Sequence, residues 1–171
     1  MIASPSPPIA RMQPKAGSSA PIEVSRATRA DLDVLAPLFD AYRMFYRQPS
    51  ELEGARAFLK DRLDRKESVI LLARDAAEGH ALGFVQLYPL FSSVAMRRIW
   101  VLNDLFVVFD ARKRGVARAL MDAARELGRA NGALRLVLET GEDNRPAQAL
   151  YETLGYRCEA GTRHYWLPLE A

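Results

Sequence analysis

The spacing of apolar residues divides the chain into helical and extended segments. Between Thr28 and Phe45 the apolar side chains recur at steps of three and four residues, which is the pattern of one buried helix face. Thr28 offers a side-chain oxygen ahead of this helix, and Asp31 follows in the first turn, where the helix dipole favours an anion. The same spacing predicts further helices over about 51–66, 115–131 and 145–154.

Other apolar residues form short runs or alternate with polar ones, as is typical of strands. The predicted strands cover about 22–27, 68–74, 82–90, 98–109, 133–139, 156–160 and 163–168. The run from Leu102 to Val108 is nearly continuously apolar around Asn103 and Asp104, as expected of a central strand covered on both faces. The order β-α-α-β-β-β-α-β-α-β-β predicts an α/β domain with a mixed sheet and helices on both faces.

The first 21 residues differ from the rest of the chain. They contain 5 of the 10 prolines and show almost no apolar periodicity. Such a segment buries too little apolar surface to offset the entropy of ordering it. We therefore expect residues 1–21 to be a disordered Pro/Ser-rich tail, and residues 22–171 to form one domain of ordinary size.

Composition narrows the class of protein. The chain is 49% hydrophobic and 26% charged, as soluble globular proteins are, and no apolar run approaches the length of a membrane span. Its single cysteine, Cys158, excludes internal disulfides and is expected in a core strand. Only two histidines are present, His80 and His164, so we expect no metal site. These features fit a cytoplasmic protein.

The net charge of +3 does not indicate a nucleic-acid partner. Of the 24 basic residues, 20 are arginines, and they are scattered from Arg11 to Arg163. Nucleic-acid binders usually concentrate their charge on one face or tail. We therefore expect at most a local anion site.

One basic turn, Arg112–Ala117, follows the central strand and opens the helix at 115–131. A helix start presents free N–H groups and a partial positive charge, which suit a phosphate. Gly115 lets an anion approach the backbone, and the cations before it add hydrogen-bond donors. Neither the P-loop nor the dinucleotide-fold pattern is matched. Taken alone, such a turn is more often a solvated run of charge.

Two segments together resemble the GNAT superfamily of acyl-CoA-dependent N-acetyltransferases. In that family, Arg/Gln-x-x-Gly-x-Gly/Ala follows the fourth strand, and it is matched here by Arg112, Gly115 and Ala117. The family's Asn-x-x-Ala-x-x-Leu-Tyr-x-x-x-Gly-Phe/Tyr segment follows the fifth strand. It is matched by Asn144, Ala147, Leu150, Tyr151, Gly155 and Tyr156. The resemblance extends over about 22–168 in element order.

The resemblance implies a mostly antiparallel sheet whose fourth and fifth strands splay apart to admit acetyl-CoA. The pantetheine arm would pair with the backbone of the fourth strand, and the pyrophosphate would lie on the basic turn. The residues that would contact the cosubstrate are Leu105, Phe106, Val107, Arg112, Lys113, Arg114, Gly115, Val116, Ala117, Arg118 and Asn144.

The resemblance also assigns chemistry. Tyr151 would be the general acid toward the departing sulfur, and its alternative role is a packing tyrosine. Asp104 is either a base or substrate ligand, or a buried structural carboxylate. In the diamine acetyltransferases, which this stretch resembles most, the residue before it is acidic, whereas here it is Asn103. The identity of the general base therefore stays open.

The expected function is direct acetyl transfer from acetyl-CoA to a small amine, without a metal, nucleic-acid or membrane partner. Acidic residues at the ends of strands four and five favour a positively charged primary amine: Asp104, Glu139, Glu142 and Asp143. Arg97 and Arg98 could instead favour an acceptor that bears a carboxylate. The alternative function is a non-catalytic acyl-CoA-sensing or partner-binding module, and a homodimer also stays open.

Overall fold

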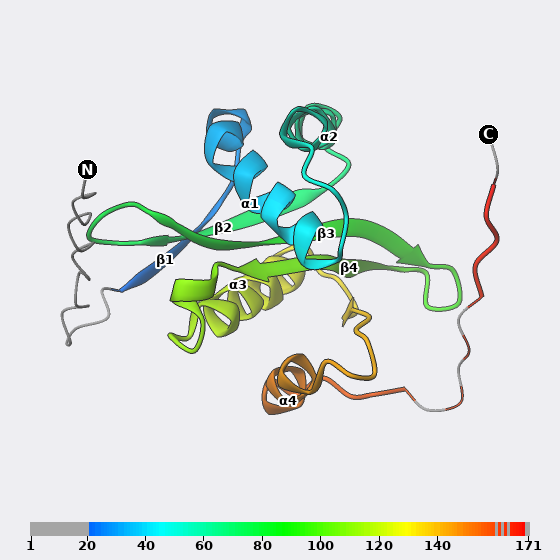
Figure 1. The fold of residues 1–171 in the computed structure, drawn as a ribbon. Coiled ribbons are helices and arrows are strands. Elements are labelled where there is room, and N and C mark those ends of the chain that lie inside the picture. Colours follow the sequence, from blue (N-terminus) through cyan, green and yellow to red (C-terminus); the bar gives the residue numbers. More distant parts are fainter. Residues whose placement is uncertain (1–20, 160, 162, 164, 170–171) are drawn as a thin grey trace, which may run out of the picture.

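The computed structural model describes residues 21–159, 161, 163 and 165–169 (Figure 1). The predicted tail therefore lies, apart from Pro21, outside the described residues. The helices are α1 (Leu32–Phe45), α2 (Leu52–Asp64), α3 (Val116–Ala130) and α4 (Arg145–Thr153), with short 3-10 turns at Arg29–Asp31 and Phe109–Ala111. The strands are β1 (Ile22–Arg26), β2 (Val69–Asp75), β3 (Ala81–Ser92), β4 (Arg97–Val107) and β5 (Leu136–Val137).

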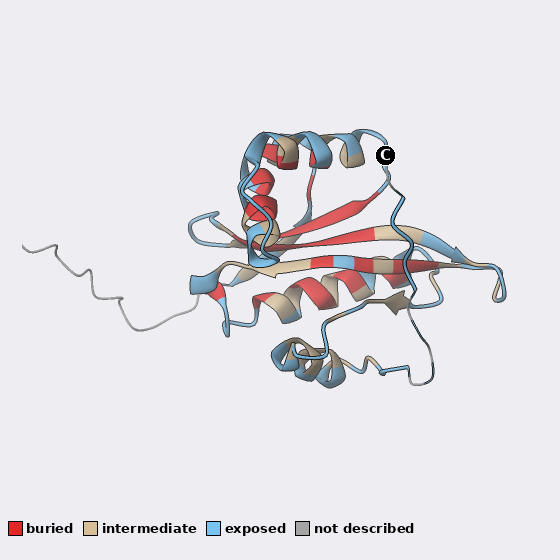
Figure 2. Cartoon of the chain, turned by 45° about the vertical axis from the view of Figure 1, so that its right-hand side comes forward, coloured by how far each residue is buried: buried red, intermediate tan, exposed pale blue. Residues whose placement is uncertain are grey.

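The strands form one mixed sheet in the order β1-β2-β3-β4-β5. Neighbours from β1 to β4 are antiparallel, and β5 runs parallel to β4. Helices α1 and α2 lie over one face of the sheet and α3 lies under the other, with α4 beyond β5 (Figures 1 and 2). The predicted fold, a single mostly antiparallel α/β domain with helices on both faces, is confirmed.

Each face of the sheet has its own apolar core (Figure 2). On the upper face, Leu35 and Leu59 of the two helices pack with Phe84 of β3. On the lower face, Leu120 and Met121 of α3 pack with Leu87 of β3. The alternation of side chains along β3 therefore supplies both layers at once.

The start of the first helical segment is fixed as the sequence indicates. The Thr28 backbone N–H donates to Asp31 Oδ2 at 2.7 Å, and the Thr28 hydroxyl accepts from the Ala30 backbone N–H at 3.3 Å. This capping box opens a short 3-10 turn, which α1 continues. Arg74 of β2 donates to the second oxygen of Asp31 at 2.7 Å, so the cap also ties the helix to the sheet.

A β-bulge in β4 decides which side chains face which layer. In the ladder with β3, Asp104 pairs with Gln86 while Leu102 pairs with Leu87, so Asn103 is an extra residue in β4. Leu102 belongs to the core under the sheet, whereas Asp104 hydrogen-bonds to Tyr42 of α1 above it. Without the extra residue, Leu102 and Asp104 would point to the same face.

Strands β4 and β5 share only a short ladder. Trp100 pairs with Leu136 and Val101 with Val137, and β4 then continues alone on that side to Val107. The predicted strand over 133–139 is thus shorter than expected. Where β4 has no β5 neighbour, the backbone of 102–107 can face another partner.

The two predicted closing strands, 156–160 and 163–168, are wrong for the residues that the structure describes. After α4, Gly155 takes a left-handed φ of +87°, which ends the helix as the sequence predicts, but the chain then runs away from the sheet (Figure 1). Cys158 is exposed rather than in the core. Alternation alone does not make a strand, because a strand also needs a neighbour to share its hydrogen bonds, and β5 is only two residues long.

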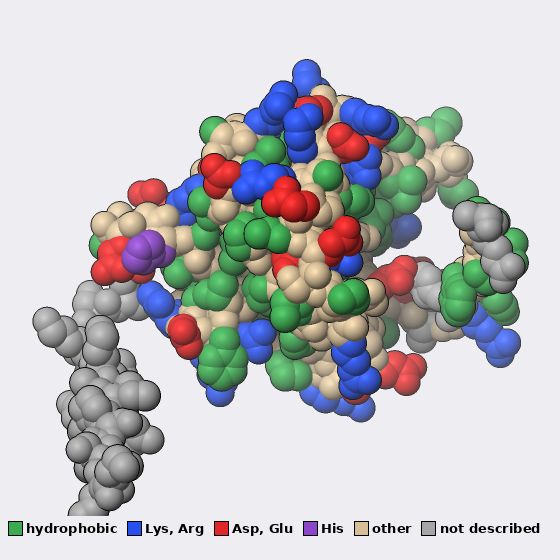
Figure 3. Space-filling model, turned by 45° about the horizontal axis from the view of Figure 1, so that its top comes forward, with side chains coloured by type: hydrophobic (Ala, Val, Ile, Leu, Met, Phe, Trp, Pro, Cys, Tyr) green, Lys and Arg blue, Asp and Glu red, His purple; other side chains and the backbone are tan. Residues whose placement is uncertain are grey.

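On the face that carries α1 and α2, positively and negatively charged side chains are interspersed with apolar ones (Figure 3). In the part of the chain that the structure describes, no helix combines the length and apolarity that crossing a membrane demands.

Candidate active site

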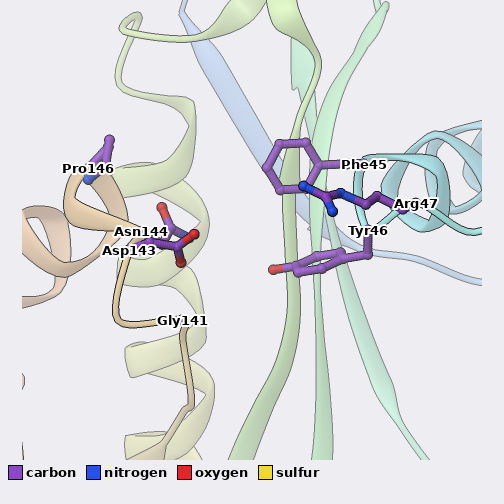
Figure 4. A pocket seen from close by; sticks show the side chains of 7 residues that line it. All are labelled: Phe45, Tyr46, Arg47, Gly141, Asp143, Asn144 and Pro146. Atoms are coloured by element: carbon purple, nitrogen blue, oxygen red, sulfur yellow. The ribbon is translucent and has the colours of Figure 1, made fainter.

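A pocket lies between the end of α1 and the loop that leads into α4 (Figure 4). Its volume is about 470 Å³. The aromatic ring of Tyr46 extends from the α1 side toward Asp143 and Asn144 on the opposite wall (Figure 4). The lining residues are Phe45, Tyr46, Arg47, Gly141, Asp143, Asn144 and Pro146.

A buried carboxylate, Asp104, lies on β4 beneath α1. Its side chain is only 5% exposed. The Asn103 amide donates to its Oδ1 at 3.1 Å, and the Tyr42 hydroxyl of α1 donates a second hydrogen bond. Burial raises the pKa of Asp104 above its usual value, and the two hydrogen bonds offset that effect only in part. The carboxylate therefore has an enhanced affinity for a proton.

Tyr42 is a site residue that the sequence does not identify. Its spacing in the sequence places it in the buried stripe of the first helix. The sequence does not show that it lies beside Asp104. Burial, and then the charge of Asp104, raise its pKa far above the ordinary value of 10.0, so the hydroxyl stays protonated at neutral pH. The available signal was that a tyrosine within an apolar stripe needs a partner for its hydroxyl.

Tyr151, the expected acid, lies on α4 and is not among the residues that line the pocket. Its half-buried ring packs against the core under the sheet and lies 5.9 Å from the ring of Tyr156. Burial, and then the neighbouring Tyr46, raise the pKa of Tyr151. Tyr46 and Tyr151 also raise the pKa of Tyr42 through their charge.

The basic turn has the open backbone that an anion would need. Lys113 and Gly115 adopt left-handed φ values of +61° and +88°. A Cβ added at Gly115 would meet no atom within 4 Å, so this side of the turn is unobstructed. Gly115 is the N-cap of α3 and accepts the helical hydrogen bond from Ala119 at 3.0 Å. The backbone N–H groups of residues 116–118, between Gly115 and Ala119, are the donors that a helix start leaves without a helical partner.

Arginine side chains connect this turn to the pocket. Arg112 Nε donates to the Val107 carbonyl at 3.2 Å, and its guanidinium lies 5.7 Å from the ring centre of Phe45 in the pocket wall. Arg118 donates to the Thr153 hydroxyl of α4 at 3.0 Å. Arg114 forms an ion pair with Asp75 at 3.4 Å.

The loop before α4 supplies the opposite wall. Asn144 is the N-cap of α4 as predicted, but its side chain does not cap the helix. Instead its Nδ2 donates to the Thr140 hydroxyl at 3.2 Å, which holds the side chain at the pocket. Asp143 also lines the pocket, whereas Glu139 and Glu142 lie outside the lining set, and all three residues are exposed.

Arg97 and Arg98 lie away from this site, toward the hairpin that joins β3 and β4. Arg97 donates to the Gly132 carbonyl at 3.2 Å, and Arg98 stacks over Phe91 and Trp100. Among the described residues, no group of three or more His, Cys, Asp or Glu side chains is placed to hold a metal ion.

The chain is similar in sequence to known acetyltransferases. The model of the Acetyltransferase (GNAT) family matches residues 35–156. The chain is 49% identical over 150 residues to the Uncharacterized N-acetyltransferase YhfO of Bacillus subtilis, which covers 88% of this chain and 99% of that protein. A Probable acetyltransferase of Haemophilus influenzae is 32% identical over 148 residues, covering 86% of this chain and 99% of the relative.

A solved structure gives the same result. The crystal structure of a probable acetyltransferase is 44% identical in sequence and superposes with a TM-score of 0.82, covering 87% of this chain and 99% of the other. These three matches cover 86% to 88% of the chain. The chain therefore belongs to the GNAT family of N-acetyltransferases, and it is an enzyme of the acyltransferase class.

Proposed function

We propose that the protein transfers the acetyl group of acetyl-CoA to a small, positively charged amine by direct attack of the amine on the thioester. The observation that carries this proposal is the contact between the open basic turn and the pocket at the end of α1. Arg112 joins them, because it contacts both the last residue of β4 and the ring of Phe45. A cosubstrate held by its phosphates at the turn would thus extend along β4 to the pocket.

The residues present fit acetyl-CoA. The unobstructed side of Gly115 and the N–H groups at the start of α3 suit a pyrophosphate. Cations from Arg112, Lys113, Arg114 and Arg118 would surround it, with Val116 and Ala117 in the first turn. The free side of β4 at Leu105, Phe106 and Val107 would pair with the pantetheine amides, and Asn144 would face it from α4.

The bound cosubstrate supplies an activated acetyl group as a thioester. A backbone N–H of β4 would polarise its carbonyl. Tyr151 would donate its proton to the departing sulfur, and its raised pKa keeps it protonated until that moment. Asp104 would take up the proton that the amine loses, for which its raised proton affinity is suited.

The pocket favours a cationic acceptor. Asp143 lies in its wall and the charge of Asp104 lies beneath α1. The faces of Phe45 and Tyr46 add surfaces that attract ammonium groups. Arg97 and Arg98, which would have favoured a carboxylate, are engaged elsewhere. Arg47 is the cation in the lining set, so a compact amine fits this balance better than a long polycation.

The test is to add acetyl-CoA to the protein with a panel of amines at equal concentration and to measure the free thiol released. We expect the fastest release with small cationic amines and slower release with amino acids and peptides. Preference for anionic acceptors would overturn the acceptor class. Tight binding of acetyl-CoA without thiol release in the presence of any amine would contradict the proposed transfer.

A further inference from the structure

Asp104 is poorly placed to meet an acceptor directly. The residue is 5% exposed, and it pairs with Gln86 next to the bulge in β4. The hydroxyl of Tyr42 hydrogen-bonds to this carboxylate, and Tyr42 is only partly buried. A proton that leaves the pocket for Asp104 would therefore meet the Tyr42 hydroxyl on the way.

The surroundings of Tyr42 hold its hydroxyl in a fixed place. Its ring centre lies 5.1 Å from that of Tyr46, 6.0 Å from Phe84 and 6.3 Å from Phe106, all in edge-to-face contact. Tyr46 lines the pocket, and both Tyr46 and Tyr151 interact electrostatically with Tyr42. Tyr42 thus bonds to the buried carboxylate through its hydroxyl and contacts Tyr46 of the pocket wall through its ring.

We propose that the Tyr42 hydroxyl is a relay that carries the proton of the acceptor amine to Asp104. This inference rests on the proposed function. The amine attacks in its neutral form, after its ammonium proton has gone to solvent. As the amine nitrogen bonds to the thioester carbonyl carbon, it gives a proton to the Tyr42 oxygen, and the proton already on Tyr42 moves to the Asp104 carboxylate. The carbon–sulfur bond breaks, and the sulfur receives the proton of Tyr151. Tyr42 is neutral before and after the step.

The other groups around Asp104 fit this role. Asn103, in the same strand, holds one carboxylate oxygen at 3.1 Å. On β3, Gln86 pairs with Asp104 in the ladder, and its side-chain amide donates a hydrogen bond of 2.8 Å to the Ser68 hydroxyl. Tyr88 lies on the same strand, and burial, followed by the charge of Asp104, raises its pKa to about 12. All the groups that act on the carboxylate are neutral at pH 7, so an arriving proton meets no competing cation among them.

A double-mutant cycle tests the relay. The variants are Tyr42→Phe, which keeps the ring contacts, Asp104→Asn, and both together, with Tyr88→Phe as the matched control. We expect each single variant to lower kcat/KM for the best amine about a hundredfold, as loss of a general base does. The kcat/KM of the double variant should be at most about threefold below that of either single variant, because each substitution removes the same proton path. Tyr88→Phe should stay within about twofold of the parent.

A second measurement does not depend on activity. Carbon-13 NMR of labelled aspartate follows the titration of the Asp104 carboxyl in the parent and in Tyr42→Phe. Loss of the Tyr42 hydrogen bond should raise the pKa of Asp104, since that bond lowers it. An unchanged titration would contradict the contact on which the relay depends.

The outcomes separate the two proposals. If Asp104→Asn keeps full activity, the base of the proposed function is wrong and the relay fails with it. If Asp104→Asn is impaired but Tyr42→Phe is not, the relay alone is overturned. If the two losses multiply in the double variant, Tyr42 acts independently of Asp104 and the relay is again overturned.

Discussion

Arg125 of α3 donates a hydrogen bond of 2.7 Å from its Nη2 to the carbonyl of Leu154, directly after α4. A second contact, from Arg118 to the Thr153 hydroxyl at 3.0 Å, joins the same two helices nearer the start of α3. Together they fix α4, which carries Tyr151, relative to the helix start proposed to hold the phosphates. The distance between the proposed phosphate site and the proposed acid is thus set by two arginines.

Replacing Arg125 should therefore weaken the attachment of α4. Arg125→Met keeps the aliphatic part of the side chain and removes the hydrogen bond, so we expect a loss of about 1 kcal/mol in unfolding free energy and a lower kcat. Thermal unfolding and steady-state kinetics measure the two effects. Arg129→Met is the control, because Arg129 lies on the exposed side of the same helix and pairs only with Glu126 among the contacts found. An equally low kcat in Arg129→Met would contradict the proposed role of Arg125 in positioning α4.

Gly115→Val should weaken acetyl-CoA binding by at least about tenfold, because the side chain would fill the space left for the phosphates. The matched control is Gly132→Val at the other end of α3. Both glycines have a left-handed φ, +88° and +62°, and open space where a Cβ would stand. Both variants should lose about 1–3 kcal/mol of stability from backbone strain. Calorimetry that finds equal acetyl-CoA affinities in the two variants would contradict a phosphate site at Gly115.

Tyr151→Phe should lower kcat by about a hundredfold and leave the KM for acetyl-CoA nearly unchanged, because only the proton donor is lost. The raised pKa of Tyr151 adds a pH test: the acid form is lost only as pH rises through that pKa, so the alkaline fall in the parent's kcat should lie above the ordinary tyrosine value of 10.0. Tyr156→Phe, whose ring lies 5.9 Å away, is the control. Turnover of Tyr151→Phe within twofold of the parent would require another acid, provided that chemistry limits the rate.

The Asp31 cap should make stability depend on pH in acid. Burial raises the pKa of Asp31, but hydrogen bonds from Thr28 and Arg74 outweigh it and lower the pKa below 3.8. The stabilisation is therefore complete above pH 3.8 and is lost as pH falls through the lower folded value. Asp31→Asn should cost about 1–2 kcal/mol at pH 7, and the gap from the parent should begin to narrow near pH 3.8 and close only below the folded pKa. Denaturant unfolding at a series of pH values measures it.

The neighbouring Asp33→Asn is the control for that series. Asp33 pairs with Arg56 at 2.6 Å on the surface, and its side chain is 84% exposed. An exposed pair contributes little, so this variant should follow the parent at every pH. An equal loss at both positions would mean that the cap has no special role.

Local pattern predicted much of the fold because each element has its own periodicity. The stripe of the first helix, the cap at Thr28 and the glycine that ends α4 are all set by near neighbours in sequence. The closing strands were wrong because alternation shows which residues could share a face but not whether a neighbouring strand is present. Trp166 and Tyr165, read as part of such a strand, are more than four-fifths exposed.

The proposed site was predictable only in part, for the same reason. The motif residues from Arg112 to Ala117 lie together on one turn. The contact between Tyr42 and Asp104 instead depends on the bulge at Asn103, which exists only in the register of β4 against β3. Register is a property of the paired strands, so neither segment shows it alone.

The central claim, direct transfer between acetyl-CoA and an amine, is tested most directly by following the acetyl group itself. The protein, in excess, is mixed with acetyl-CoA that carries a deuterated acetyl group and with the amine that released most thiol, and the reaction is quenched at intervals for mass spectrometry. The account predicts one labelled acetyl group on the amine for each CoA released, with no label on the protein at any time. Label that appears first on the protein, or CoA released without a labelled amine, would contradict it.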